Sequence, residues 1–115
     1  MNAFFALLVH PSRVGDPGLR EQLRLACLDA GPETFRRQQI AIMGRVDSRP
    51  FLPKIRVPTL VLSGDEDRLI RNDFSREMAE LIPNAALVIV PHCGHMAPLE
   101  QPQAVNAALG RWFAA

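Results

Sequence analysis

Apolar positions recur at helical spacing through the first half of the chain. Asp16-Pro17 offers a helix N-cap followed by proline at the first helical position. Apolar or small residues then come every three or four positions, at Leu19, Leu23, Cys27 and Ala30, until Gly31-Pro32 ends the run. A second helix is predicted from Glu33 to Met43, with Phe35, Gln39, Ile42 and Met43 on one side.

The pattern changes near Pro50. Two short, continuous apolar runs follow, Thr59 to Gly64 and Ala86 to Val90, and such runs are typical of strands that are covered on both faces of a parallel sheet. After the first, Asn72 or Asp73 would cap a helix carrying Phe74, Met78, Leu81 and Ile82; after the second, a helix from about Pro102 would carry Val105, Leu109, Trp112 and Phe113. This order predicts an α/β fold with two neighbouring parallel strands joined by a right-handed crossover. Two strands alone do not make a stable sheet, so we expect another part to complete it.

The composition is that of one modest soluble domain. The chain has 115 residues, of which 48% are hydrophobic and 22% charged, and a net charge of +1. This charge gives no reason to expect a nucleic-acid partner or an anionic membrane surface. The longest apolar stretch, Ala3 to Val9, is far shorter than the ~20 residues of a membrane span, and no secretory signal is visible. Two cysteines are too few for a disulfide framework, so we expect a cytoplasmic protein.

Two titratable side chains follow the two predicted strands. Asp67 comes three residues after Gly64, and His95 follows the second strand after Pro91-His92-Cys93-Gly94. Because the carboxyl ends of parallel strands meet at one edge of a sheet, the two side chains are expected within hydrogen-bond reach. A carboxylate there can orient a histidine that carries protons in acyl transfer. Taken singly, Asp67 also fits a solvated turn acid and His95 a surface histidine.

The same loop offers two other chemistries. His92, Cys93 and His95 could hold zinc or copper, but their spacing is tight and no further Cys or His cluster supplies the remaining ligands. No metal or other cofactor is therefore assigned. Cys93 could be a thiol nucleophile served by a histidine, although a small apolar filler beneath the loop is the favoured interpretation.

A nucleophilic serine is missing from the pattern. Serine occurs at Ser12, Ser48, Ser63 and Ser75, and none of these stands in a Gly-x-Ser-x-Gly turn. No His-Gly-Gly loop offers oxyanion donors either. The chain thus presents an acid and a base without the group that they would activate.

From Ile55 to Phe113 the chain resembles the C-terminal part of an α/β-hydrolase fold enzyme. The matching text is IRVPTLVLSGDED, which ends at Asp67, and PHCGHMAPLEQP, which contains His95. The resemblance implies that Asp67 orients a catalytic His95. Residues 1–54 resemble part of the helical cap of that family, where Phe4, Phe5, Leu7 and Leu8 would lie on a cap helix and Phe4, Phe5 and Leu8 would line the substrate pocket. The implied organisation is a cap-like segment, 1–54, and the C-terminal part of the hydrolase core, 55–115.

The resemblance lacks the half of the family that carries the nucleophile. We therefore interpret the chain as a truncated or split hydrolase, which would hydrolyse a small ester or amide substrate only if a nucleophile is supplied elsewhere. The alternative is a catalytically inactive fragment that self-associates or binds a complementary hydrolase half, because a half-sheet exposes a strand edge and apolar faces. Lyase, peroxidase and dehalogenase chemistries occur on the same scaffold, so the substrate and reaction class stay open.

Overall fold

A pair of parallel strands carries the two loops of interest. The computed structural model describes residues 2–115, and in it β1 (Leu60–Gly64) pairs with β2 (Ala86–Val90) from Leu60 opposite Ala86 to Gly64 opposite Val90. The predicted parallel arrangement is confirmed. Both strands end at the same edge, which places the loops that follow them side by side.

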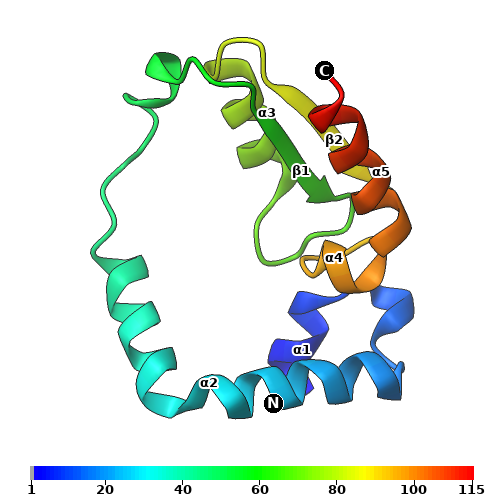
Figure 1. Cartoon of the computed structure of the whole chain (residues 1–115). Helices are drawn as coiled ribbons and strands as arrows, with labels where there is room; N and C mark the ends of the chain where they lie inside the picture. Colours follow the sequence, from blue (N-terminus) through cyan, green and yellow to red (C-terminus); the bar gives the residue numbers. More distant parts are fainter. Residues whose placement is uncertain (1) are drawn as a thin grey trace.

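Helices cover the strand pair. α3 (Asn72–Leu81) connects β1 to β2, while α4 (Ala97–Glu100) and α5 (Pro102–Phe113) follow β2. Figure 1 shows α3 and α5 flanking the two strands on opposite sides. The core beneath α5 consists of Val90, Cys93, Ala97 and Val105, with Leu62, Val88 and Ala104 packed against it.

The expected helix faces after the strands are only partly buried. On α3, Phe74 and Met78 are exposed whereas Ser75 and Ile82 are buried; on α5, Leu109 and Phe113 are exposed whereas Val105 and Ala108 are buried. The expected cap of α3 is also wrong, because Arg71 occupies the N-cap position. Asn72 instead uses its side chain to tie α3 to β1: it accepts a hydrogen bond from the Ser63 hydroxyl at 2.8 Å and donates to the Asp65 carbonyl at 3.0 Å.

The N-terminal segment forms a second core. α1 (Asn2–Leu8) and a 3-10 turn, η1 (Pro11–Arg13), precede the long α2 (Pro17–Met43). The predicted cap is present, since the Asp16 carboxylate accepts a hydrogen bond from the Leu19 N–H at 3.0 Å. The core consists of Phe5, Val9, Leu19 and Leu23, with Leu8, Val14 and Met96 packed against it.

α2 is broken where the sequence indicates an end. Gly31 adopts φ 75° and ψ 164°, which is outside the helical region and open to glycine, and Pro32 follows it. Of the apolar positions that recur at helical spacing here, only Leu19 and Leu23 are buried, while Cys27, Ala30 and every residue from 32 to 51 are exposed. In Figure 1 the second half of α2 turns away, and the chain returns to β1 along an open path that includes η2 (Leu52–Lys54).

None of the helices in the described residues has the length and hydropathy needed to cross a membrane.

Candidate functional site

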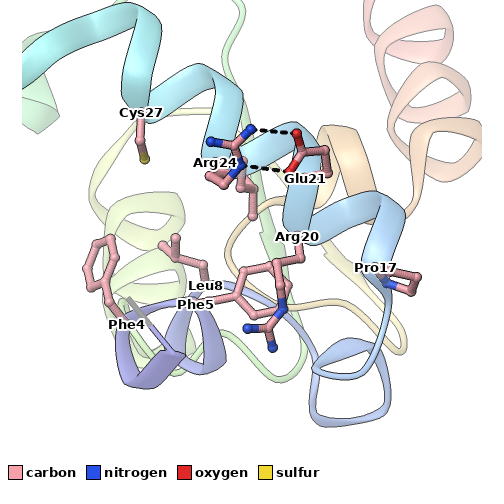
Figure 2. Close-up of a pocket in the computed structure, with 9 residues that line it drawn as sticks. Phe4, Phe5, Leu8, Pro17, Arg20, Glu21, Arg24 and Cys27 are labelled. Carbon is pink, nitrogen blue, oxygen red and sulfur yellow. Dashed lines mark hydrogen bonds and ion pairs between the residues drawn. The ribbon is translucent and has the colours of Figure 1, made fainter.

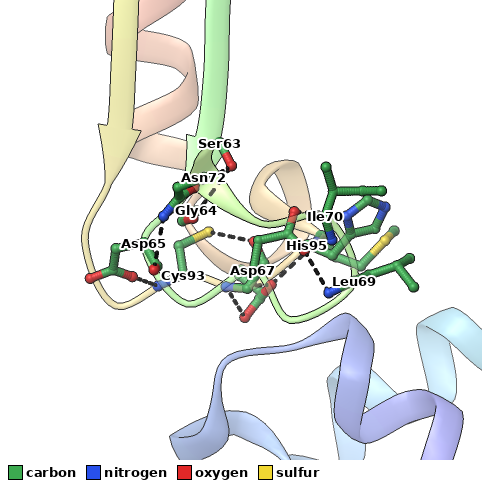
Figure 3. A network of polar contacts seen from close by, with 12 residues as sticks. Ser63, Gly64, Asp65, Asp67, Leu69, Ile70, Asn72, Cys93 and His95 are labelled. Atoms are coloured by element: carbon green, nitrogen blue, oxygen red, sulfur yellow. Dashed lines mark hydrogen bonds and ion pairs between the residues drawn. The ribbon is translucent and has the colours of Figure 1, made fainter. Parts of the chain in front are cut away.

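Asp67 lies in the loop after β1 with both carboxylate oxygens engaged. Oδ1 accepts hydrogen bonds from the N–H groups of Leu69 at 2.9 Å and Ile70 at 2.8 Å. Oδ2 lies 2.9 Å from Nδ1 of His95 (Figure 3). The Asp67 side chain is only 7% exposed, so its orientation is set by these three partners.

His95 lies in the loop after β2 and is held by its ring and its backbone. Since a carboxylate only accepts hydrogen bonds, the 2.9 Å contact requires the proton on Nδ1 and leaves the lone pair of neutral imidazole on Nε2. The ring is 32% exposed, so it is within reach of a reactant. The backbone N–H of His95 donates to the Leu8 carbonyl at the end of α1 at 3.0 Å. The sequence-predicted pair is thus brought together at one edge of the strand pair.

Backbone pairing continues past the strands and joins the two loops. The Asp65 N–H donates to the Val90 carbonyl and the Glu66 N–H to the Cys93 carbonyl, each at 2.9 Å. In return, the Asp65 carboxylate accepts from the N–H groups of His92 at 3.0 Å and Cys93 at 2.9 Å. Partial burial acts to raise the pKa of Asp65, but these hydrogen bonds and the nearby His10 and His92 outweigh it and lower the pKa below its ordinary value.

Two carboxylates that organise this edge were not singled out from the sequence. Asp65 and Glu100 lie within the two segments that carry the family resemblance, and the sequence pattern assigns neither of them a role. Glu100 is 4% exposed and accepts hydrogen bonds from the N–H groups of His10, Gly94 and Met96. Its position in the sequence could have pointed to it, because Glu100 lies only five residues after His95, at the end of the short helix α4.

Cys93 is a core residue. Its side chain is fully buried, and burial, followed by the negative charge of Glu100, raises the pKa of its thiol to about 12. A thiol with that pKa stays protonated at neutral pH and is a poor nucleophile. In the described residues no group of His, Cys, Asp and Glu has the arrangement to hold a metal ion, so neither alternative for the His92–His95 segment gains support.

The serines are engaged elsewhere. The Ser63 hydroxyl bonds to Asn72, and Ser12 shares a hydrogen bond of 2.7 Å with Nδ1 of the neighbouring His10. Ser75 is buried within α3, and Ser48 is exposed in the segment that leads back to the strands. No hydrogen bond links His95 to a serine among residues 2–115.

A pocket lies between α1 and α2, and its lining residues all belong to these two helices. Phe4, Phe5 and Leu8 all line it, together with residues of α2 that include Leu23 and Cys27 (Figure 2). Its volume is about 160 Å³ and its wall is mostly apolar. The Arg20 guanidinium lies 4.6 Å from the centre of the Phe5 ring and closes one side. Leu8 belongs both to this wall and, through its carbonyl, to the support of His95.

Comparisons with known proteins agree on one family. The family model described as the alpha/beta hydrolase fold matches residues 28–102. An esterase structure from Thermogutta terrifontis superposes with a TM-score of 0.89 at 32% identity over 96% of this chain and 41% of its own. A Mycobacterium tuberculosis protein provisionally named as the non-heme bromoperoxidase BpoC is 33% identical over 98 residues, 85% of this chain and 31% of its own length. A 2-hydroxy-6-oxo-6-(2'-aminophenyl)hexa-2,4-dienoic acid hydrolase of Metapseudomonas resinovorans is 38% identical over 53 residues, 46% of this chain and 18% of its own length.

The chain thus spans less than half the length of these relatives. The family-model match begins within α2 and includes both strands, whose parallel order is the one expected from the sequence. On these grounds, the chain belongs to the α/β-hydrolase fold family.

Proposed function

We propose that this chain supplies the aspartate and histidine of a Ser-Asp-His triad, and that with a nucleophilic serine from a further segment it hydrolyses small ester or amide substrates. The observation that carries the proposal is the 2.9 Å contact between Asp67 Oδ2 and His95 Nδ1, across two loops at one sheet edge. Membership of the α/β-hydrolase family supports it, because triads in that family follow the chain order Ser, Asp, His.

In this proposal His95 carries the proton. Its Nε2 takes the proton from the serine hydroxyl as the serine attacks the carbonyl carbon, and then delivers it to the leaving oxygen or nitrogen. Asp67 keeps the proton on Nδ1 and stabilises the imidazolium that forms. A water molecule then attacks the acyl-enzyme while His95 takes its proton. His95 returns that proton to the serine oxygen as the acid is released.

The pocket beside α1 is the proposed site for the apolar part of the substrate. A volume of about 160 Å³ accommodates one small apolar group, comparable with a benzene ring or a short acyl chain. Phe4, Phe5 and Leu8 would contact that group. The similarity to an esterase supports an ester as the substrate. The other relatives are named as a bromoperoxidase and a dienoic acid hydrolase, so an activity assay must decide the reaction class.

The partner that we propose is a complementary hydrolase segment bearing the serine. β1 is paired on one edge only within the described residues. Large apolar side chains are exposed on the segment that returns to β1, among them Leu28, Phe35, Ile42, Met43, Val46 and Phe51. Such exposure destabilises a chain in water unless another part covers it. A second copy of this chain is the alternative occupant, which would make the protein an inactive, self-associating fragment of the kind expected above.

A chimaera tests the catalytic proposal. This chain would replace the matching segment of the Thermogutta terrifontis esterase, and hydrolysis of p-nitrophenyl acetate would be measured. We expect turnover that falls roughly 10⁴-fold in D67N and roughly 10⁶-fold in H95A, as for loss of the aspartate and the histidine of triads in other hydrolases. E80Q, a change at an exposed position of α3, is the control and should change the rate less than about threefold. Turnover that survives H95A would show that the proposed histidine is not used.

Mass determination in solution distinguishes the two proposed partners, a second copy of this chain and a complementary hydrolase segment. A dimer that persists on dilution supports a second copy. A chain that is monomeric alone and forms a 1:1 complex with the serine-bearing part of the esterase supports the complementary segment.

A further inference from the structure

Glu100 is a buried carboxylate whose partners are backbone N–H groups. Oε1 accepts from the N–H of His10 at 2.7 Å, Oε2 accepts from the N–H of Met96 at 3.1 Å, and both oxygens lie 3.1 Å from the N–H of Gly94. The guanidinium of Arg13 donates to the backbone carbonyl of Glu100 at 3.2 Å. The negative charge is therefore balanced mainly by three amide dipoles, which is a strong and directional arrangement.

These three amides lie on the two sides of His95 and on the segment that faces it. Gly94 and Met96 are the chain neighbours of His95. His10 follows the end of α1, where the Leu8 carbonyl accepts the N–H groups of His95 at 3.0 Å and Met96 at 3.1 Å. The Glu100 side chain thus holds the backbone on both sides of His95. It also holds the segment after α1, whose Leu8 carbonyl accepts the His95 N–H.

The loop has little room to relax if this support is removed. A Cβ atom built on Gly94 would lie 2.5 Å from the His10 nitrogen and 2.5 Å from the Val9 carbonyl carbon. The backbones of Gly94 and Val9 are therefore in direct contact, and their separation is set by the hydrogen bonds around them. A shift of about 1 Å in such a loop is enough to misalign a catalytic group.

We propose that Glu100 is a positioning residue, which sets the place and orientation of His95 relative to Asp67 by binding the amides of Gly94, Met96 and His10. The inference rests on the proposed function of His95. A glutamine at this position has one acceptor oxygen and an NH₂ group that would face N–H donors, so it cannot reproduce the three contacts. The carboxylate, and not merely a polar side chain of this size, is required.

Nuclear magnetic resonance of the isolated chain tests the inference without serine or substrate. The Nδ1 proton of His95, bonded to Asp67, should give a low-field signal that disappears in D67N. In E100Q we expect this signal to be lost or broadened, and exchange of the Gly94 and Met96 amide protons to accelerate at least tenfold. E80Q, the same change at an exposed position of α3, is the matched control and should leave both unchanged.

Faster amide exchange with an unchanged His95 signal would overturn the inference, because a purely structural carboxylate would behave that way. If E100Q does not fold, E100D decides: it keeps the charge but is one methylene shorter. If Glu100 positions His95, the low-field His95 signal in E100D should weaken as the amide protons of Gly94 and Met96 exchange faster. A wild-type chain without the low-field signal would overturn the Asp67–His95 pair itself and this inference with it. An inactive chimaera alongside a positive result here would instead contradict only the hydrolase proposal.

Discussion

The backbone of Gly64, the last residue of β1, touches the backbone of Gly94, the residue before His95. A Cβ atom built on Gly64 would lie 2.2 Å from the Gly94 carbonyl oxygen and 2.3 Å from the Cys93 carbonyl oxygen. The loop bearing the histidine therefore passes across the end of β1 at a distance that only glycine allows.

Replacing Gly64 by alanine should displace this loop. Because backbone atoms block the new methyl group, we expect G64A to lower the free energy of unfolding by about 3 kcal/mol. G110A is the matched control, since nothing lies within 4 Å of the new methyl group in α5, and it should raise stability by roughly 0.5–1 kcal/mol. Urea unfolding of both variants provides the measurement. Equal stability of G64A and wild type would contradict the close contact.

Asp67 has two separable roles, which two substitutions distinguish. D67N removes the acceptor for His95 but retains an oxygen for the Leu69 and Ile70 amides, whereas D67A removes both. We expect both variants to abolish the proposed catalysis of the chimaera. In urea unfolding, D67A should be less stable than D67N by about 1 kcal/mol, the net value of a hydrogen bond. Equal stabilities would show that Oδ1 does not support the loop.

The lowered pKa of Asp65 predicts a dependence of stability on pH. The folded carboxyl has a pKa below the unfolded value, so the unfolded chain binds the proton first as the pH falls. The contribution of Asp65 should be fully present above about pH 5 and decline below pH 4, towards the folded pKa. Comparing wild type with D65N by urea unfolding at pH 3, 4, 5 and 7 measures it. The difference should shrink towards low pH, and a difference that grew there would reverse the predicted sign.

The two cysteines should differ sharply in reactivity. Cys27 is exposed, whereas Cys93 is buried with a pKa of about 12. An aromatic disulfide reagent at pH 8 should therefore titrate one thiol rapidly and the second only after unfolding. In C27S the rapid phase should vanish. A rapid phase that persists in C27S would mean that Cys93 is accessible and would reopen its role as a nucleophile.

Local pattern predicted the strands well and the burial of helix faces poorly. The runs ending at Gly64 and Val90 are short, apolar and bounded by turn residues, so their parallel pairing followed from the order of elements. Helical spacing placed Phe35, Ile42 and Phe74 on apolar faces, yet these residues are exposed. Periodicity identifies the face that a helix can bury, but a partner must be present for burial to occur, and the described chain does not contain one for these faces.

By itself, the sequence determined that an aspartate and a histidine follow two neighbouring parallel strands, because strand order and loop position place them at one edge. The tertiary structure alone decided that Asp67 Oδ2 meets His95 Nδ1 and that Glu100 supports the loop from beneath. Those contacts depend on the close approach of Gly64 to Gly94 and of α1 to the His95 loop, between segments far apart in the chain. Sequence spacing defines which residues come near an edge, whereas backbone packing between distant segments sets the distances at which side chains bind.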